Sequence, residues 1–483
     1  MVNSVSLLLT NEAYRNDVAE EIRLFLGNIP IVPDADNADF VIKVALTREG
    51  DTLLASASSG ESVAEFQTAL PAADALTVKR HEKRAVKIAA FRLMKKLFPT
   101  PMPWGSLTGI RPTKLFRELV EDGGEAYARE MFLDTFDVTP EKTSLCETTC
   151  REQAEAIASA GARTIDLYFG VPYCKTRCLY CSFGTELAKS GAVLDGYLAA
   201  LMRDIELSAG VVRDAAKSIR ASYFGGGTPS ILSAKQTERL LKAAVSAYGG
   251  LGRECTFEAG RPDTITAEKL SVLRDYGIRR ISINPQTMND ATLYRIGRLH
   301  TAREIEKTYL LARNMGFTDI NMDLIIGLPG ETEKDVANSV SRVLSLSPEN
   351  VTVHTLCIKR SSRLKAQLEK YPMVPAAEAE SMVRICRTFC EQAGLYPYYL
   401  YRQKYMQGNL ENVGYAKRGT LCLYNVDIME ETESIMAHGA GAISKRVYGV
   451  GRRIERVPNP KDVPTYLAKI PSLIASKKAL FLD

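Results

Sequence analysis

The sequence predicts an α/β fold whose centre is an open three-quarter (β/α)6 TIM-like barrel. A small N-terminal α/β domain precedes the barrel, and a C-terminal α+β cap follows it. From about Thr164, short apolar runs alternate with amphipathic stretches. This order is typical of a parallel sheet covered by helices. The alternation gives six units, whereas a closed barrel of this kind needs about eight, so we expect an open barrel.

The length of the chain sets the number of domains. Its 483 residues are enough for two or three domains with a large core. We place an N-terminal α/β accessory domain at 1–150, the partial barrel at 160–360, and a C-terminal region that covers the substrate at 361–483.

The N-terminal domain mixes strand and helix patterns. The expected strands are Ser4 to Leu9, Phe40 to Leu46 and Leu53 to Ala57, and the expected helices are Asp17 to Leu26 and a long basic helix from Ala75 to Leu97.

A loop rich in Pro and Gly between Pro101 and Pro112 contains Trp104, the only Trp in the chain. This loop is either a lid, with Thr108 and Arg111 reaching an anionic group, or a segment that Trp104 anchors to a core. We favour the anchor, because a single Trp is more often buried than functional.

The barrel is predicted from its alternating elements. The expected strands are Ile165 to Phe169, Ala221 to Phe224, Cys255 to Phe257, Arg280 to Ile283, Ile320 to Ile325 and Val351 to Leu356. The expected helices are Leu194 to Leu207, Gln236 to Tyr248, Ala267 to Tyr276, Arg303 to Met315 and Lys334 to Leu346.

Composition narrows the class of protein. The chain is 46% hydrophobic and 25% charged, with a net charge of +5. These values are ordinary for a globular protein, and they argue against a dedicated nucleic-acid binder, whose basic residues would cluster. No apolar run approaches the roughly 20 residues that span a bilayer, and the N-terminus does not resemble a signal peptide. We therefore expect a cytoplasmic protein without a membrane span.

Three cysteines, Cys174, Cys178 and Cys181, follow the first barrel strand. A zinc knot would usually bring a fourth ligand from a second Cys or His pair, and a disulfide does not suit a reducing compartment. Iron-sulfur clusters normally take four cysteines. Three thiolates would therefore leave one iron free for an exogenous ligand, such as the amino and carboxylate groups of S-adenosylmethionine. We favour the cluster, with zinc and uncommitted thiols as the alternatives.

Further polar or flexible residues stand at the ends of the next four strands. Gly225, Gly226, Gly227 and Thr228 follow the second strand, Glu258 closes the third, Gln286 follows the fourth, and Asp323 lies near the end of the fifth. Each has a plain structural interpretation, as a tight turn or a helix cap. Active sites of βα barrels gather at these strand ends, so we expect one common site.

These motifs together resemble the radical S-adenosylmethionine enzymes of the oxygen-independent coproporphyrinogen III oxidase group, over about Ile165 to Ile358. The matching features are Tyr168, Cys-x-x-x-Cys-x-Tyr-Cys, Gly-Gly-Gly-Thr-Pro, Glu258, Gln286, Arg298 in Ile-Gly-Arg, and the segment Asp323 to Gly330. The Trp104 loop, Asn284-Pro-Gln-Thr-Met and Val353-His-Thr-Leu-Cys-Ile-Lys-Arg further resemble the HemZ-type coproporphyrinogen dehydrogenases.

The resemblance implies a role for each residue. Cys174, Cys178 and Cys181 would ligate a [4Fe-4S] cluster, and Tyr168 would lie near the sulfonium of S-adenosylmethionine. Further contacts to that cosubstrate are implied for Gly226, Gly227 and Thr228 at the methionine part, for Glu258, Gln286, Arg298 and Asp323 at the polar groups and ribose, and for Ile325 at the adenine.

The implied reaction belongs to porphyrin and haem biosynthesis. An electron from a donor such as flavodoxin or ferredoxin would enter the cluster, and a 5′-deoxyadenosyl radical would take a hydrogen atom from a propionate of the tetrapyrrole substrate. Loss of carbon dioxide and one electron would leave a vinyl group. Two rounds would convert coproporphyrinogen III to protoporphyrinogen IX.

One position departs from the pattern of the oxidases in this group. Oxidases of this group typically carry a further cysteine where this chain has Phe183, a residue that the haem-trafficking relatives also carry. The alternatives are therefore a haem-binding or trafficking protein, in which His354 or His438 would ligate iron, and another radical enzyme acting on a tetrapyrrole. The aromatic and basic run from Tyr396 to Tyr405 would suit a tetrapyrrole with propionates.

Overall fold

The computed structural model of the chain describes residues 2–32, 38–70, 74–188, 190–404, 406–449 and 453–482. Tyr405, at the end of the aromatic run, lies outside these residues. The chain folds into two compact units, Met1–Cys146 and Glu147–Asp483. Among the described residues, no helix has the length and apolar character needed to cross a bilayer.

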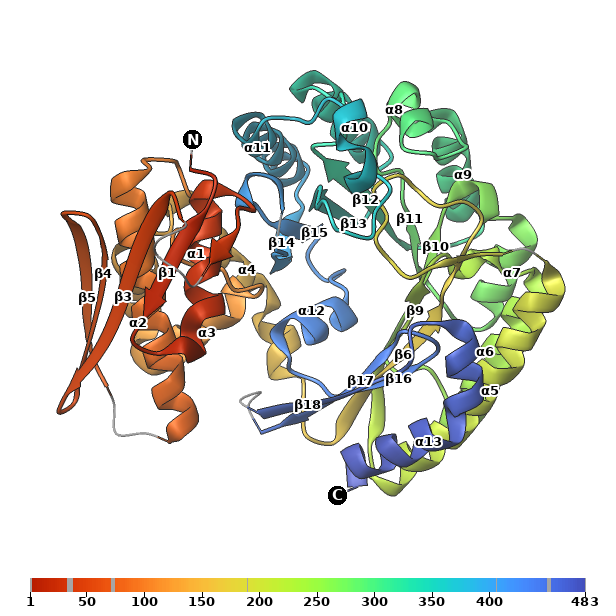
Figure 1. The fold of residues 1–483 in the computed structure, drawn as a ribbon. Helices are drawn as coiled ribbons and strands as arrows, with labels where there is room; N and C mark the ends of the chain where they lie inside the picture. The colour runs from red at the N-terminus through yellow and green to blue at the C-terminus, as the bar shows by residue number, and fades with distance from the viewer. Residues whose placement is uncertain are drawn as a thin grey trace. The chain divides into compact units, whose positions relative to one another are not determined.

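A five-stranded sheet forms the centre of the first unit (Figure 1). Its strand order is β2-β1-β3-β4-β5, parallel from β2 to β3 and antiparallel from β3 to β5. The elements are β1 Val5–Leu9, α1 Arg15–Leu26, β2 Ile31–Val32, β3 Phe40–Glu49, β4 Thr52–Ser59, β5 Ser62–Ala69, α2 Ala75–Leu97, α3 Pro112–Glu130, a π-helix Met131–Thr135 and the start of α4 Pro140–Ala158.

The core of the first unit comes from alternate strand positions and from one face of each of α1 and α2. Val5, Leu7, Ile22 and Ile42 are completely buried in it, as the alternation of apolar residues predicts for a sheet covered on one side. The three predicted strands and both predicted helices are present, and β2 and β5 are additional.

The loop with Trp104 is held inside this unit. Trp104 is fully buried, and Thr108 donates a hydrogen bond of 3.3 Å to Glu21. Lys87 also contacts both Thr108 and Glu21. Burial of Glu21 raises its pKa to about 7, although Lys87 opposes this shift. Trp104 thus serves as the buried anchor that the sequence favours.

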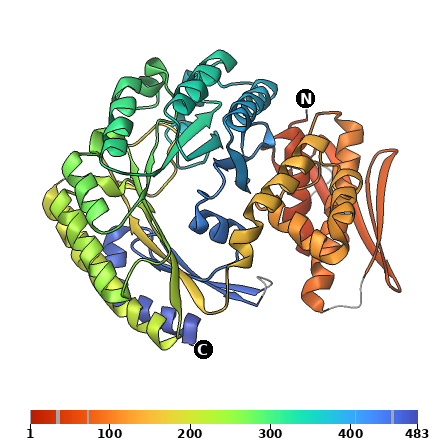
Figure 2. The same cartoon turned by 180° about the vertical axis from the view of Figure 1, so that it is seen from behind.

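The second unit is built on an eleven-stranded, strongly curved sheet (Figures 1 and 2). The strand order is β14-β15-β13-β12-β11-β10-β9-β6-β16-β17-β18. The six strands β6, β9, β10, β11, β12 and β13 run parallel and follow one another in sequence. This confirms the predicted α/β fold with an open, parallel core.

The strands of the second unit are β6 Thr164–Val171, β7 Tyr173–Cys174, β8 Glu186–Leu187, β9 Ser218–Gly226, β10 Glu254–Gly260, β11 Arg280–Ile283, β12 Asp319–Ile326, β13 Asn350–Thr355, β14 Tyr396–Tyr401, β15 Asn412–Ala416, β16 Ile435–His438, β17 Ile443–Tyr448 and β18 Arg453–Pro458. The helices are α5 Gly191–Asp214, α6 Ala234–Tyr248, α7 Ala267–Asp275, α8 Asp290–Arg295, α9 Ala302–Asn314, α10 Glu333–Ser345, α11 Ala376–Gln392, α12 Leu423–Glu430 and α13 Val463–Leu482.

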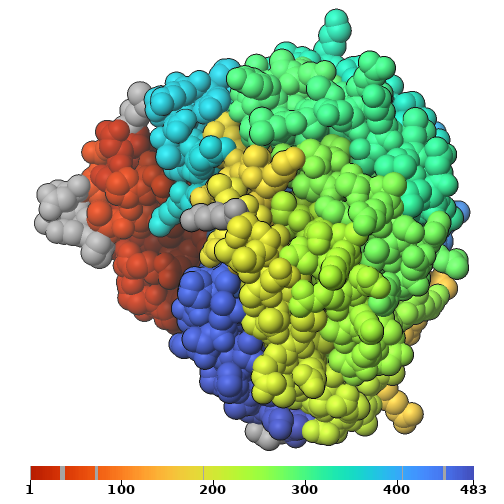
Figure 3. Space-filling view, turned by 90° about the vertical axis from the view of Figure 1, so that its right-hand side faces the viewer, coloured from red at the N-terminus to blue at the C-terminus, as the bar shows by residue number. Residues whose placement is uncertain are grey.

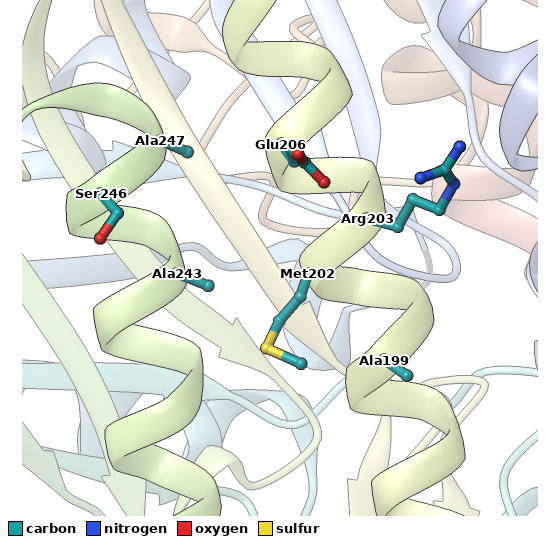
Figure 4. A pocket seen from close by; sticks show the side chains of 7 residues that line it. All are labelled: Ala199, Met202, Arg203, Glu206, Ala243, Ser246 and Ala247. Carbon is teal, nitrogen blue, oxygen red and sulfur yellow. The ribbon is translucent and has the colours of Figure 1, made fainter.

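Helices α5, α6 and α7 cover the outside of the sheet and form one broad face (Figure 3). Several of the helices begin with a capping box, as at Ser233 of α6 and Thr301 of α9, which satisfies the first backbone amides of the helix. A hollow of about 450 Å³ lies between α5 and α6 on this outer layer (Figure 4). It is lined by Ala199, Met202, Arg203, Glu206, Ala243, Ser246 and Ala247, so it contains no predicted site residue.

The C-terminal region, which was predicted to cap the barrel, also adds strands to the sheet. Strands β14 and β15 extend the sheet beyond β13, whereas β16 pairs in parallel with β6 at the other side. Helix α12 lies within the curve of the sheet (Figure 1). A buried ion pair of 2.8 Å between Arg220 and Asp427 ties α12 to β9, and one of 2.6 Å between Lys477 and Asp204 ties α13 to α5.

Candidate active site at the carboxyl ends of the strands

The loop with the three cysteines leaves the carboxyl end of β6. Cys178 is buried, whereas Cys174 and Cys181 are partly buried. Burial raises the pKa of Cys181, the Phe183 backbone amide opposes this shift, and the charges of Cys178 and Cys174 add to it. In the described part of the chain, no three His, Cys, Asp or Glu side chains are already gathered around one point to hold a metal ion. The role of the three thiols as cluster ligands therefore stays a prediction.

The glycine turn after β9 is joined directly to the cysteine loop. The amide of Gly227 donates to the carbonyl of Val171 and the amide of Thr228 to the carbonyl of Tyr173, both at 2.8 Å. The Thr228 hydroxyl lies 3.4 Å from the Cys174 sulfur. A Cβ added at Gly227 would lie only 2.5 Å from the Tyr173 oxygen. Glycine is therefore required here for the close approach of two backbones.

Glu258, at the end of β10, faces the interior of the sheet. It accepts a hydrogen bond of 2.5 Å from the hydroxyl of Tyr223 on β9. Burial raises the pKa of Glu258 to about 7, Tyr223 lowers it, and the negative charge of Asp323 raises it further. Near neutral pH the Glu258 carboxyl group is therefore partly ionised. A ligand with a positive charge would favour its ionised form.

Gln286 and Asp323 are fixed to each other through the backbone. The Gln286 amide donates to the Asp323 carbonyl at 2.8 Å, and the Gln286 carbonyl accepts from Ile325 at 2.9 Å. Gln286 has a φ of +68°, a conformation that is uncommon outside glycine. Its side-chain oxygen is buried without a hydrogen-bond partner. The Gln286 side-chain oxygen is therefore an unpaired hydrogen-bond acceptor, on a residue that is bonded through its backbone to Asp323 and Ile325.

Arg298 lies next to the cysteine loop. Burial alone would lower the pKa of Arg298, but the charges and hydrogen bonds of Tyr180 and Cys178 raise it. Its Nη1 donates to the carbonyl of Asn284, whereas its Nε and the Asn284 side-chain oxygen are buried without partners. Arg298 therefore keeps a permanent positive charge beside Cys178, and its Nε–H remains available as a hydrogen-bond donor.

Tyr168 takes part in a stack of three rings. Its ring lies 6.4 Å from that of Tyr223 and 6.2 Å from that of Tyr424 of α12, and the Tyr223 and Tyr424 rings are 4.7 Å apart. Burial raises the pKa of Tyr168. The three rings form an aromatic wall next to Glu258, whose carboxyl group accepts the Tyr223 hydrogen bond.

The two candidate haem ligands have different surroundings. His438 is completely buried; its Nδ1 lies 2.8 Å from the Tyr168 carbonyl and its Nε2 lies 2.7 Å from the Tyr248 hydroxyl. Both nitrogens are therefore engaged, and burial lowers the pKa to about 4. This removes His438 as a candidate iron ligand. The His354 side chain is 26% exposed and lies 3.6 Å from Asp323.

The structure thus brings most predicted residues into two adjoining groups. One joins the cysteine loop, Gly227, Thr228 and Arg298, and the other joins Tyr168, Glu258, Gln286, Asp323 and Ile325. Sequence reasoning missed Tyr223, although its place two residues before Gly225 on a strand puts both on one face. It also missed Tyr424, which no local signal connects to the barrel.

Comparison with known proteins gives the family. Residues 168–343 match the radical SAM superfamily. The chain is 37% identical over 439 residues to the oxygen-independent coproporphyrinogen-III oxidase-like protein HemZ of Bacillus subtilis, covering 89% of this chain and 87% of HemZ. It is 30% identical over 280 residues to the heme chaperone HemW of the same organism, covering 57% of this chain and 69% of HemW.

A solved structure agrees in fold. Coproporphyrinogen III oxidase (HemN) from Escherichia coli, described as a radical SAM enzyme, matches with a TM-score of 0.52 and 23% identity over 66% of this chain and 71% of HemN. At this identity the likeness establishes the fold alone.

Proposed function

The chain belongs to the radical SAM family of the oxygen-independent coproporphyrinogen-III oxidase-like protein HemZ, and from this premise we propose that it catalyses the oxidative decarboxylation of coproporphyrinogen III to protoporphyrinogen IX without oxygen. The observation that carries the proposal is the match to HemZ over nearly the whole chain. Its cofactors are a [4Fe-4S] cluster and S-adenosylmethionine.

The residues at the strand ends fit these two cofactors. Thiolates are the usual ligands of such clusters, and the loop offers three of them. The turn at Gly227 has no room for a Cβ, and the buried atoms Asn284 Oδ1, Gln286 Oε1 and Arg298 Nε have no partner. Unpaired buried polar atoms are costly. Those of Asn284 and Arg298 beside the cysteine loop, and that of Gln286 beside Asp323, therefore support a polar ligand at the strand ends.

We assign the residues as follows. Cys174, Cys178 and Cys181 hold the cluster, and Tyr168, Gly226, Gly227, Thr228, Glu258, Gln286, Arg298, Asp323 and Ile325 hold S-adenosylmethionine. Together the two cofactors supply a 5′-deoxyadenosyl radical, which abstracts hydrogen. Glu258 binds the amino group in its charged form, Asp323 accepts hydrogen bonds from ribose hydroxyls, and the ring of Tyr168 keeps water from the reacting centre.

The proposal is tested under anaerobic conditions. The protein is reconstituted with iron and sulfide, reduced with dithionite, and given S-adenosylmethionine and coproporphyrinogen III, and the products are followed by mass. We expect protoporphyrinogen IX and 5′-deoxyadenosine. Formation of 5′-deoxyadenosine without protoporphyrinogen IX would reject the substrate and keep the radical chemistry.

A matched pair of cysteine variants tests the cluster assignment. Cys178→Ala should abolish the cluster absorbance and both products. Cys255→Ala is the control, because Cys255 stands at the amino end of β10, and it should retain both. Full turnover in Cys178→Ala would contradict the assignment.

A second function, haem handling, is favoured by the similarity to HemW and by Phe183, which stands where the oxidases of the group have a further cysteine. His354 is then the iron ligand, because His438 has no free nitrogen. Titration with haem, followed by absorbance, separates the two functions. Stable one-to-one binding that His354→Ala abolishes, without consumption of coproporphyrinogen III, would favour the carrier.

A further inference from the structure

Three loops meet over the cysteine motif and form one surface, which we call the basic loop surface. It consists of the cysteine loop at 175–183, the residues after α8 at 296–299, and the segment 359–365. Leu179 donates to the Ile296 carbonyl and Leu364 donates to the Leu179 carbonyl, both at 2.9 Å.

Side-chain hydrogen bonds also connect the cysteine loop to the segment 359–365. Arg177 donates to the Ser361 carbonyl at 3.0 Å, and the Ser361 hydroxyl donates to the Ser182 carbonyl at 3.2 Å. Arg363 also donates to the Arg177 carbonyl. The segment 359–365 is therefore held against the cysteine loop and is part of the same surface.

The surface is strongly cationic. The residues that define it contain seven cationic side chains and no acidic one; the cations are Lys175, Arg177, Arg298, Lys359, Arg360, Arg363 and Lys365. Arg298 is buried, and Lys175 forms an ion pair of 3.2 Å with Asp263, so the other five provide the free positive charge. The overall chain is nearly balanced, with 62 basic and 57 acidic residues, so this local excess is not a consequence of composition. For Arg360 and Lys365, both exposed, the described residues provide no ion-pair partner.

An exposed aromatic ring lies among these charges. Phe183 is 68% exposed, two residues after Cys181, and its backbone amide hydrogen-bonds that cysteine. Leu299, on the second loop, is 64% exposed. Large apolar side chains at a charged surface are typical of sites that another protein covers.

We propose that the basic loop surface docks a small acidic protein that carries single electrons, and that Phe183 is the apolar centre of the contact. This inference rests on the proposed function, because only a redox-active cluster requires a donor. The donor loses one electron and the cluster gains one, with no bond made or broken. Electron-transfer contacts are small and short-lived, and opposite charges around them mainly increase the rate of association.

The charge of the surface is tested with the double variant Arg360→Glu/Lys365→Glu. The control is Lys242→Glu/Lys307→Glu, an equal charge change at exposed positions of α6 and α9. Reduced flavodoxin is mixed with each reconstituted protein, and cluster bleaching is followed by stopped flow. We expect roughly tenfold slower reduction in the surface variant, a much weaker salt dependence, and no change in the control.

Two further measurements separate this inference from the proposed function. Dithionite should reduce all the variants equally and give equal 5′-deoxyadenosine, since it needs no docking site. Titration of flavodoxin against the protein without its cluster should show weaker binding for both Arg360→Glu/Lys365→Glu and Phe183→Ser. Failure of coproporphyrinogen III turnover with normal cluster reduction would reject the substrate and leave the docking site intact.

The proposal is overturned by any of three results. These are equal reduction of the surface variant and the control by flavodoxin, no reduction of the unaltered protein by either flavodoxin or ferredoxin, and unchanged donor binding with a raised KM for the tetracarboxylate substrate. The last result would assign the surface to the substrate.

Discussion

Two buried arginines at opposite ends of the parallel sheet show how this protein divides structure from function. Arg220, near the amino end of β9, donates to Asp427 at 2.8 Å and to the carbonyls of Ser159 and Ala156 at 2.7 Å each. Arg298, at the carboxyl ends, has a buried Nε without a partner. Arg220 therefore uses its hydrogen-bond donors for folding, whereas Arg298 keeps one of its donors available for a ligand.

We expect the largest loss of stability from a substitution of Arg220, near the amino end of β9. Arg220→Met would leave the buried carboxyl groups of Asp427 and Asp166 without their cation. Removing one partner of a buried ion pair costs about 3–5 kcal/mol, and urea unfolding should show this loss. In the folded fraction, S-adenosylmethionine affinity should stay unchanged. A large loss of affinity would break the division between the two ends.

The second prediction concerns the glycine turn at the carboxyl end. Gly227→Ala places a Cβ 2.5 Å from a backbone oxygen, and the cysteine loop or the turn must move. We expect a loss of S-adenosylmethionine affinity of about 2 kcal/mol, or roughly thirtyfold, measured by equilibrium dialysis. Gly191→Ala is the control, because a Cβ at this first residue of α5 meets nothing within 4 Å. Equal losses of affinity would contradict the prediction.

One carboxyl group at each end of the sheet has a raised pKa. Burial raises the pKa of both Glu258, at the carboxyl end, and Asp319, at the amino end, to about 7. In each case the folded protein binds the proton more tightly than the unfolded chain. Each group therefore lowers the stability progressively as the pH rises from about 4 to 7, and the full penalty remains above pH 7.

Only Glu258 should couple this titration to ligand binding. S-adenosylmethionine affinity should rise by up to about tenfold per pH unit between pH 6 and 7 as Glu258 ionises, and Glu258→Gln should remove the rise. Asp319→Asn should change the pH dependence of unfolding. It should leave the pH dependence of S-adenosylmethionine affinity unchanged. An unchanged profile in Glu258→Gln would remove Glu258 from the site.

The smallest expected effect comes from the residue that positions Glu258. Tyr223→Phe removes one hydrogen bond, which is worth about 1 kcal/mol, and keeps the ring packed against Tyr168 and Tyr424. We expect S-adenosylmethionine to bind roughly fivefold more weakly. The curve of its affinity against pH should shift to higher pH, because the Tyr223 hydroxyl lowers the pKa of Glu258. A change in affinity without a shift in the profile would assign Tyr223 a packing role only.

Elements whose signals are local could be predicted from the pattern of residues along the chain. Alternation of apolar runs and helices gave the parallel core, because burial of one face sets the period of each element. The spacing of Cys174, Cys178 and Cys181 pointed to a metal cluster, and the strand ends located Glu258 and Asp323, because parallel strands all end on one side.

Contacts between side chains that are far apart in the sequence could be seen only in the folded chain. Tyr424 stacks on Tyr223, which stands some two hundred positions earlier, and both nitrogens of His438 are engaged by residues of β6 and α6. The C-terminal strands β15 and β16 extend the sheet at both sides of the parallel core. Such contacts depend on packing between distant elements, and a pattern read along the chain contains only the preferences of neighbours.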